Sequence, residues 1–139
     1  MKPPPLEQFY FSYIIQHLGP LSAYFISQEE KFTAYENPGR IVSRMIFMLP
    51  HQKILVLTVQ LSVLLTDSVP EVLEYVFQAT LNNATLLRFD SVPHHKNIAT
   101  FPHHKHIGSS ERVEPLDDPS FRTFINQVAL RCHLGDESL

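Results

Sequence analysis

The chain has 139 residues, the size of one domain, so a single core is expected over residues 1–139. Hydrophobic residues make up 44% of the chain and charged residues only 18%, a composition that excludes an intrinsically disordered protein. The formal net charge of −3 at pH 7 excludes a general nucleic-acid coat, because wrapping a polyanion needs a strong positive excess. Any contact with nucleic acid is therefore expected to be local.

Export and membrane insertion are not expected. Three prolines and a glutamate within residues 1–8 leave no apolar stretch of the kind that a signal peptide needs. The longest apolar-rich run, residues 54–65, has 12 residues, well short of the roughly 20 that a membrane helix requires. The single cysteine, Cys132, excludes an internal disulfide. The expected location is the cytoplasm.

The N-terminal part predicts a helix and then a change to strand. Apolar residues at three- and four-residue spacings predict a helix over residues 5–18, which stops at Gly19-Pro20. The period then changes and indicates strand at residues 23–27 and 31–35. The helix carries more aromatic residues than one core-facing stripe needs, which raises the hypothesis of a homodimer or partner contact; these are Phe9, Tyr10, Phe11 and Tyr13.

The middle of the chain reads as an antiparallel meander. Residues 41–49 and 53–65 are predicted to form a hairpin. In the second strand the apolar residues from Leu55 to Leu65 share one face, and Thr58, Gln60 and Ser62 share the other. Residues 71–81 also alternate, although a helix fits their apolar spacing too. Asn82-Asn83 predicts a turn, because asparagine tolerates left-handed backbone angles, and residues 84–90 return as a further strand.

The chain closes with a second helix. Asp118 is the predicted cap and Pro119 the first helical residue, followed by an apolar stripe of Phe121, Phe124, Ile125 and Val128. Residues 133–139 are expected to be a frayed tail. The summed pattern predicts an α+β fold: an antiparallel sheet of about five strands, with the N-terminal and C-terminal helices packed on it.

A histidine-rich segment, residues 88–108, connects the strands to the last helix. Five of the eight histidines lie between positions 94 and 106, where Pro-His-His-Lys-Asn-Ile at 93–98 recurs as Pro-His-His-Lys-His-Ile at 102–107. Histidines are rarely clustered for packing, because each buried ring has two nitrogens that need partners. The segment is therefore the candidate site.

One chemistry open to this segment is metal binding. If residues 103–107 are extended, His104 and His106 share one face, with His103 and Lys105 on the other. Two imidazoles so placed could hold a divalent ion such as zinc if one more ligand came from His94, His95 or Asp90. No standard zinc spacing is present, and the neighbouring lysines disfavour a dication.

The second chemistry needs no cofactor. Cleavage of an RNA phosphodiester through the 2′-hydroxyl requires a base, an acid, and a cation near the developing charge. His104 and His106 are the predicted acid–base pair and Asp90 the residue that orients a ring, with His103, His94 and His95 as further candidates. The predicted phosphate ligands are Arg88, Lys96 and Lys105.

A purely structural role is the third interpretation. Prolines 93 and 102 could hold an extended loop across the sheet, in which the histidines bond to backbone carbonyls while Phe101 and Ile107 enter the core. The other histidines, at positions 17, 51 and 133, and the thiol of Cys132 are expected to be incidental.

The same segment resembles the hallmark of the TumE-like toxin family of bacterial and archaeal toxin–antitoxin modules. The resemblance lies in Arg88-Phe89-Asp90-Ser91-Val92-Pro93-His94-His95 and in Thr100-Phe101-Pro102-His103-His104-Lys105-His106-Ile107-Gly108, followed by an acidic stretch at 111–114 and the closing helix. The segment departs from the family pattern in two places. Ser91 replaces an asparagine, and Lys96-Asn97 replaces Pro-Glu.

The resemblance implies a small cytosolic toxin that is neutralised by a co-expressed antitoxin, typically a helix-turn-helix protein. It does not define the reaction. A histidine-dependent ribonuclease activity follows from the residue chemistry alone, with a metal-binding protein and a non-enzymatic interaction module as alternatives.

Overall fold

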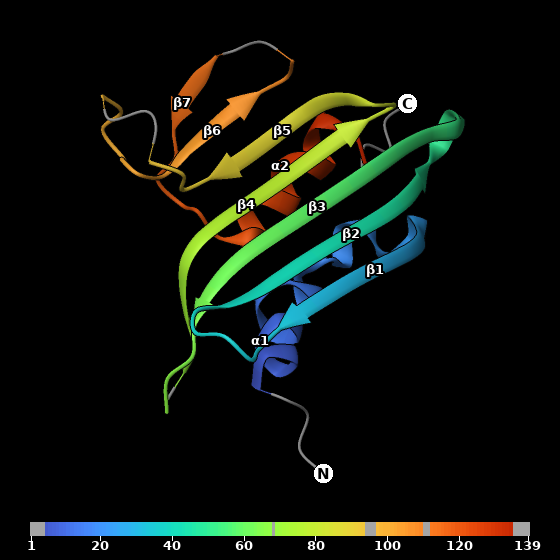
Figure 1. The fold of residues 1–139 in the computed structure, drawn as a ribbon. Coiled ribbons are helices and arrows are strands. Elements are labelled where there is room, and N and C mark those ends of the chain that lie inside the picture. The colour runs from blue at the N-terminus through green and yellow to red at the C-terminus, as the bar shows by residue number, and fades with distance from the viewer. Residues whose placement is uncertain (1–4, 68, 94–96, 110–111, 135–139) are drawn as a thin grey trace.

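The structure is a computed structural model that describes residues 5–67, 69–93, 97–109 and 112–134. Its main feature is a seven-stranded antiparallel sheet in the order β1-β2-β3-β4-β5-β6-β7 (Figure 1). Each strand pairs with the next one in sequence, because each connection returns the chain directly to the neighbouring position. The strands are β1 (Phe25–Thr33), β2 (Gly39–Leu49), β3 (Lys53–Leu64), β4 (Glu71–Leu81), β5 (Ala84–Asp90), β6 (His104–Ile107) and β7 (Val113–Pro115).

One face of the sheet is the core, and the opposite face, called the open face below, carries both polar and apolar side chains. In β2 every second side chain is buried, as period-two alternation requires. The same alternation runs through β3, and β4 buries Tyr75, Phe77 and Ala79 on the core side. The side chains between them lie on the open face.

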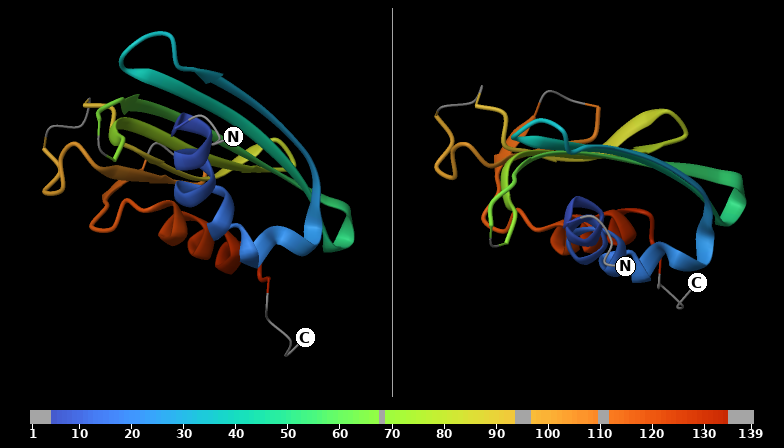
Figure 2. Two further views of the ribbon diagram at one scale, coloured as in Figure 1. Left: turned by 90° about the horizontal axis from the view of Figure 1, so that it is seen from below. Right: turned by 60° about the horizontal axis from the view of Figure 1, so that its bottom comes forward.

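The two α-helices, α1 (Pro5–Tyr13) and α2 (Phe121–Arg131), lie together on the core face (Figure 2). Two short 3₁₀ helices, η1 (Ile15–His17) and η2 (Gly19–Tyr24), follow α1, and a third, η3 (Pro50–Gln52), forms the tip of the β2–β3 hairpin. From α1, the Tyr10 hydroxyl donates to Ser43 Oγ at 2.5 Å, inside the core. No described helix covers the open face, and none is long and apolar enough to cross a membrane.

The predicted α+β class is confirmed, with seven strands where about five were expected. The two predicted strands at 23–27 and 31–35 form one strand, β1, because residues 28–30 stay in register with β2. The two additional strands, β6 and β7, lie in the segment that was expected to be a connection. Both are short, and they form because the free edge of β5 offers unpaired backbone groups to β6, and β6 in turn to β7.

The helix ends differ from the prediction. The last α-helical bond of the first helix runs from Ile14 N–H to the Tyr10 carbonyl, after which the chain tightens into 3₁₀ turns. The second helix is capped by Ser120 rather than by Asp118: the Ser120 hydroxyl accepts from the Thr123 N–H at 3.2 Å. Asp118 supports that cap by accepting from the Thr123 hydroxyl at 2.6 Å, a hydrogen bond that lowers the pKa of the carboxyl.

The aromatic residues of α1 are divided between the core and the surface. Tyr10 is buried and Phe9 stacks on Tyr13 with ring centroids 5.1 Å apart, whereas Phe11 is 59% exposed. One exposed aromatic ring is ordinary for a protein surface. The homodimer therefore stays a prediction.

Candidate functional site

The candidate site forms where β5 pairs with β6. In this ladder Arg88 lies opposite His106 and Asp90 lies opposite His104. Because side chains two residues apart on a strand point to the same face, all four lie on the same, open face, as the alternation in the sequence predicts. The name "histidine cluster" is used below for these four residues.

The Asp90 carboxylate is the centre of the histidine cluster. Its Oδ1 accepts the Val92 N–H at 3.1 Å and lies 2.9 Å from Nε2 of His104. Its Oδ2 accepts from Nε of Arg88 at 2.8 Å and lies 3.6 Å from Nε2 of His106. Asp90 is fully buried, and a buried carboxylate is tolerated only where partners of this kind compensate its charge.

His104 is enclosed in the protein. The residue is 1% exposed, and its Nδ1 lies 2.9 Å from the carbonyl oxygen of Pro102. Since a carbonyl can only accept, Nδ1 carries a proton, and Nε2 is the nitrogen that faces Asp90. A ring held in this way fixes the position of Asp90 and is closed to solvent, with Nε2 directed at the carboxylate.

His106 and Arg88 are the accessible members of the histidine cluster. The side chain of His106 is 22% exposed and that of Arg88 is 35% exposed. The rings of His106 and His104 approach edge to face, with centroids 5.0 Å apart. A ligand on the open face can therefore reach one imidazole and one guanidinium, both held by the same carboxylate.

His103 and Lys105 lie on the core side of the sheet, away from the histidine cluster. His103 stacks on Tyr75, and its Nδ1 is 3.0 Å from the Tyr75 hydroxyl. Lys105 lies opposite Phe89 in the ladder, and its Nζ is 3.9 Å from a carboxylate oxygen of Glu114. The structure thus separates these two candidates from the four that it brings together. The candidates His94, His95 and Lys96 lie outside the described residues.

Two hydroxyl groups that were not among the predicted site residues, those of Thr100 and Ser91, hold the loop around the site. Thr100 Oγ1 donates to the carbonyl of His103 at 2.6 Å and accepts from the Leu116 N–H at 2.8 Å. Ser91, one of the departures from the family pattern, accepts from the Tyr75 N–H at 3.0 Å through its Oγ. The sequence does not reveal these two roles, because Ser91 and Thr100 bond to Tyr75 and Leu116, which are distant from them in the chain.

The purely structural interpretation is met in part. His104 does bond to a backbone carbonyl, and Ile107 packs against the core. Phe101, which this interpretation places in the core, is 42% exposed. Its ring therefore does not anchor the loop, because the bonds of Thr100 hold the backbone there instead.

The cluster also has the donor set of a metal site. One ligand atom each from Asp90, His104 and His106 lies within 4.8 Å of the other two. Imidazole and carboxylate are ligands that zinc and related divalent ions accept. A dication there would compete with Arg88, which already occupies Oδ2 of Asp90 at 2.8 Å.

We expect the ionisation of Tyr75 to destabilise the protein at alkaline pH. Burial, and then the charges of Tyr13 and Asp90, raise the pKa of Tyr75 above its ordinary value of 10.0. A group whose pKa is raised on folding contributes its full stability below the unfolded pKa and loses it as the pH rises through the folded one. The free energy of unfolding should therefore fall above about pH 10.

Urea unfolding of the wild type and of Tyr75→Phe, each at several pH values from neutral upwards, measures this effect. We expect Tyr75→Phe to be less stable by about 1 kcal/mol at neutral pH, since the bond to His103 is lost. The variant should also lose less stability in alkali. Burial raises the pKa of Tyr10 and of Tyr13 as well, so part of the decline remains. An equal decline of the unfolding free energy with pH in the two proteins would show that Tyr75 does not contribute to the loss of stability in alkali.

A comparison with protein families identifies the chain. The family model described as Toxin TumE matches residues 26–131. The chain belongs to this family. The match extends from the second residue of β1 to the end of α2, so it includes nearly all of the sheet and the histidine cluster. Comparisons with curated proteins and with solved structures found no match. Membership in the TumE family gives this protein the function of a toxin.

Proposed function

We propose that this TumE family toxin cleaves RNA, with His106 as the group that moves the proton and Arg88 as the ligand of the phosphate. The observation that supports this is the single buried carboxylate of Asp90, which contacts both residues on an open sheet face. A shared anchor holds the imidazole and the guanidinium at a fixed separation, which is what acid–base catalysis at a phosphate requires.

The reaction that fits is transfer of the phosphoryl group to the neighbouring 2′-hydroxyl. His106 takes the proton of the hydroxyl, O2′ bonds to phosphorus, and the bond from phosphorus to O5′ breaks. The products are a 2′,3′-cyclic phosphate and a 5′-hydroxyl. In this scheme water supplies the proton of the departing O5′.

Arg88 has a divided role in this scheme. Its Nε is occupied by Asp90, so the terminal nitrogens of the guanidinium are the ones that face a ligand. Guanidinium donors match phosphate oxygens in geometry and charge. They would stabilise the extra negative charge that develops on the phosphorane. Lys105 is left out of the proposed site because it faces α2.

The antitoxin belongs to the same proposal. A toxin of a toxin–antitoxin module needs a cognate inhibitor, and we expect a helix-turn-helix protein that blocks the open face near the histidine cluster. RNA is then the substrate and the antitoxin the protein partner. Both act on the same face, so binding of one should exclude the other.

The direct test measures RNA cleavage by the purified full chain and growth arrest on induction. We expect His106→Gln to reduce both, with cleavage falling about 100-fold or more, because glutamine keeps a similar volume but transfers no proton. The matched control is His51→Gln, since His51 is an exposed histidine in η3 at the end of the β2–β3 hairpin. It should act like the wild type.

The product ends separate the proposed chemistry from other routes. A 2′,3′-cyclic phosphate is expected, and it should form equally in the presence of a chelator. A folded His106→Gln protein that still cuts RNA at the wild-type rate would overturn the assignment. RNA that stays intact with the wild type, while growth still stops, would favour a non-enzymatic interaction module.

Metal binding is the second candidate function, and the compact set of Asp90, His104 and His106 favours it. Calorimetric titration with zinc, and separately with manganese, tests it on the purified protein. One ion bound per chain in the wild type and none in His106→Gln would support a metal centre. Absence of heat with either ion would remove this candidate.

A further inference from the structure

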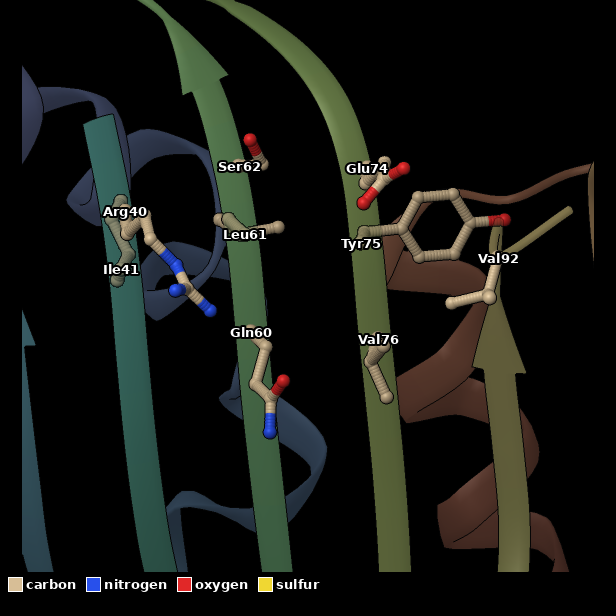
Figure 3. Close-up of a pocket in the computed structure, with 9 residues that line it drawn as sticks. All are labelled: Arg40, Ile41, Gln60, Leu61, Ser62, Glu74, Tyr75, Val76 and Val92. Carbon is tan, nitrogen blue, oxygen red and sulfur yellow. The ribbon is translucent and has the colours of Figure 1, made fainter. Parts of the chain in front are cut away.

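A small hollow lies on the open face beside the histidine cluster (Figure 3). It has a volume of about 70 Å³, which suits one edge of a planar ring rather than a whole nucleotide. It crosses β2, β3 and β4 and ends against the segment that follows β5. The side chains that matter for the argument are Arg40, Gln60, Ser62, Glu74, Val76 and Val92.

Two opposite charges flank the hollow without pairing. Arg40 lies opposite Ser62 in the β2–β3 ladder, and Ser62 lies opposite Glu74 in the β3–β4 ladder. One strand therefore separates the two charged residues, a span of about 10 Å between their backbones. Both are exposed, and within the described part of the chain neither has an ion-pair partner. Their hydrogen-bonding capacity is therefore available to a ligand.

The lining offers donors on one side and acceptors on the other. Figure 3 shows the guanidinium of Arg40 reaching towards β3 near Gln60, with Glu74 across from it on β4. Arginine only donates and an ionised glutamate only accepts, whereas the amide of Gln60 can do both. The two valines, Val76 and Val92, add apolar surface. A matching ligand is flat, with acceptors at one edge and donors at another.

Guanine has this arrangement. Its O6 and N7 are acceptors, the pair that arginine contacts most often among the bases, and its N2 amino group is a donor. Adenine has an amino group, a donor, in place of O6, so at that position the guanidinium would meet a second donor instead of an acceptor. The charges of Arg40 and Glu74 therefore favour guanine over adenine, because an unmatched donor or acceptor in a recognition site is costly.

The hollow adjoins the histidine cluster directly. Val92 lines the hollow, and its backbone N–H donates to Oδ1 of Asp90 at 3.1 Å. Val76, also in the lining, lies opposite Asp90 in the β4–β5 ladder. Gln60 is one strand further away, so the backbones of these two lining residues lie about 5–10 Å from that of Asp90. Arg88 lies opposite Gln78, which is about 14 Å along β4 from Glu74. A nucleotide in the hollow and the extended side chain of Arg88 together span this distance.

We propose that this hollow is a base subsite for guanine, which selects the RNA nucleotide presented to the histidine cluster. The subsite names the substrate class of the ribonuclease activity and rests on that proposed function. Glu74 and Arg40 are then residues of specificity, since they contact the base and are remote from the bond that breaks. Their loss should change which RNA is bound more than how fast a bound RNA is cut.

Binding of mononucleotides tests the subsite without any need for cleavage. Calorimetry or NMR titration of the full chain with the 3′-monophosphates of guanosine, adenosine, cytidine and uridine gives four affinities. We expect guanosine to bind at least tenfold more tightly than adenosine. Glu74→Gln and Arg40→Gln should each remove most of this preference, with little effect on the affinity for uridine monophosphate.

The controls use residues of the same type on the same face. Glu29 and Arg44 lie opposite each other in the β1–β2 ladder, outside the hollow, so Glu29→Gln and Arg44→Gln should keep the guanosine preference. Equal affinity for all four nucleotides would overturn the subsite, as would a Glu74→Gln protein with the wild-type preference. Either result can occur while RNA is still cut.

Failure of the ribonuclease proposal gives a different pattern. If RNA stays intact but guanosine monophosphate binds with the expected dependence on Glu74, the guanine site stands and the cleavage chemistry falls. If RNA is cut with no preference for guanosine at the cleavage site and no selective binding, the reverse holds. The two proposals are therefore decided by separate measurements on the same preparations.

Discussion

Asp90→Asn should reduce RNA cleavage about 1000-fold and abolish growth arrest, a larger effect than the loss of His106 alone. Asparagine keeps the shape of the side chain but lacks the charge that holds Arg88 at 2.8 Å. Its amide group also brings a donor to a place where Arg88 and the Val92 N–H both need an acceptor. The phosphate ligand and the proton-transfer group lose their common anchor in one step.

The same substitution should lower the free energy of unfolding by about 1.5–3 kcal/mol, because hydrogen bonds to a buried charge are replaced by weaker ones. Chemical denaturation and circular dichroism show whether the variant is folded under assay conditions. Asp117→Asn is the matched control, since Asp117 is exposed and should affect neither cleavage nor stability by more than about 0.5 kcal/mol. A folded Asp90→Asn protein with wild-type cleavage would show that the carboxylate positions nothing.

His104 and His106 look equivalent in the sequence, but they differ in solvent exposure in the structure. His104 and His106 have the same spacing and the same face, and both are predicted as an acid–base pair. The exposure differs because His104 lies nearer the buried carboxylate and is covered from behind by the Pro102 carbonyl. Truncation of His104 would therefore leave a buried cavity beside Asp90 and destabilise the fold. His106 is the informative position for a test of catalysis.

Much of the fold could be predicted because the two-residue apolar repeat of a strand differs from the three- and four-residue repeat of a helix. In residues 55–65 the alternate positions are all apolar, so the pattern fixes which face is buried. Residues 71–81 fit either period by spacing, and the structure gives β4, since pairing with β3 and β5 on both sides outweighs local preference. The strands that were missed, β6 and β7, have four and three residues. Strands this short are stable only when they pair with the edge strand of a sheet that has already formed.

The site could be predicted by residue type but not by its partners. The sequence shows that histidines, a carboxylate and an arginine are available, and alternation places His104 with His106. Which cation joins them depends on the register of β5 against β6: Arg88 faces His106, whereas Lys105 faces the opposite side with Phe89. The hollow was not predictable at all, because Arg40, Gln60 and Glu74 come from three strands and carry no common motif.

The position of the site also depends on the core beneath it. Phe89 lies between Arg88 and Asp90 on β5 and points to the opposite face, where its ring meets Phe124 of α2 with centroids 5.1 Å apart. Packing of α2 against the sheet therefore holds β5 in place, and β5 carries Arg88 and Asp90 of the histidine cluster. Loss of this packing is expected to lower both stability and cleavage.

Phe124→Ala should lower the free energy of unfolding by about 3–5 kcal/mol. Phe124 is fully buried, and its ring lies 5.7 Å from that of Phe77 and 5.9 Å from that of Phe121, in addition to Phe89. Alanine removes the ring and leaves a cavity between the helix and the sheet, which the rigid strands cannot close. Domains of this size are stable by only about 5–15 kcal/mol, so the variant should lose a large share of its stability.

Urea unfolding measures the change, as a lower midpoint with an unaltered slope. Leu130→Ala is the control on the same helix: Leu130 is 71% exposed, so its loss should change stability by no more than about 0.5 kcal/mol. A cost below 1 kcal/mol for Phe124→Ala would show that α2 does not hold the sheet. With the expected cost, cleavage by the folded fraction should fall as well, because β5 loses the packing that fixes Asp90 and Arg88 between Phe89 and the open face.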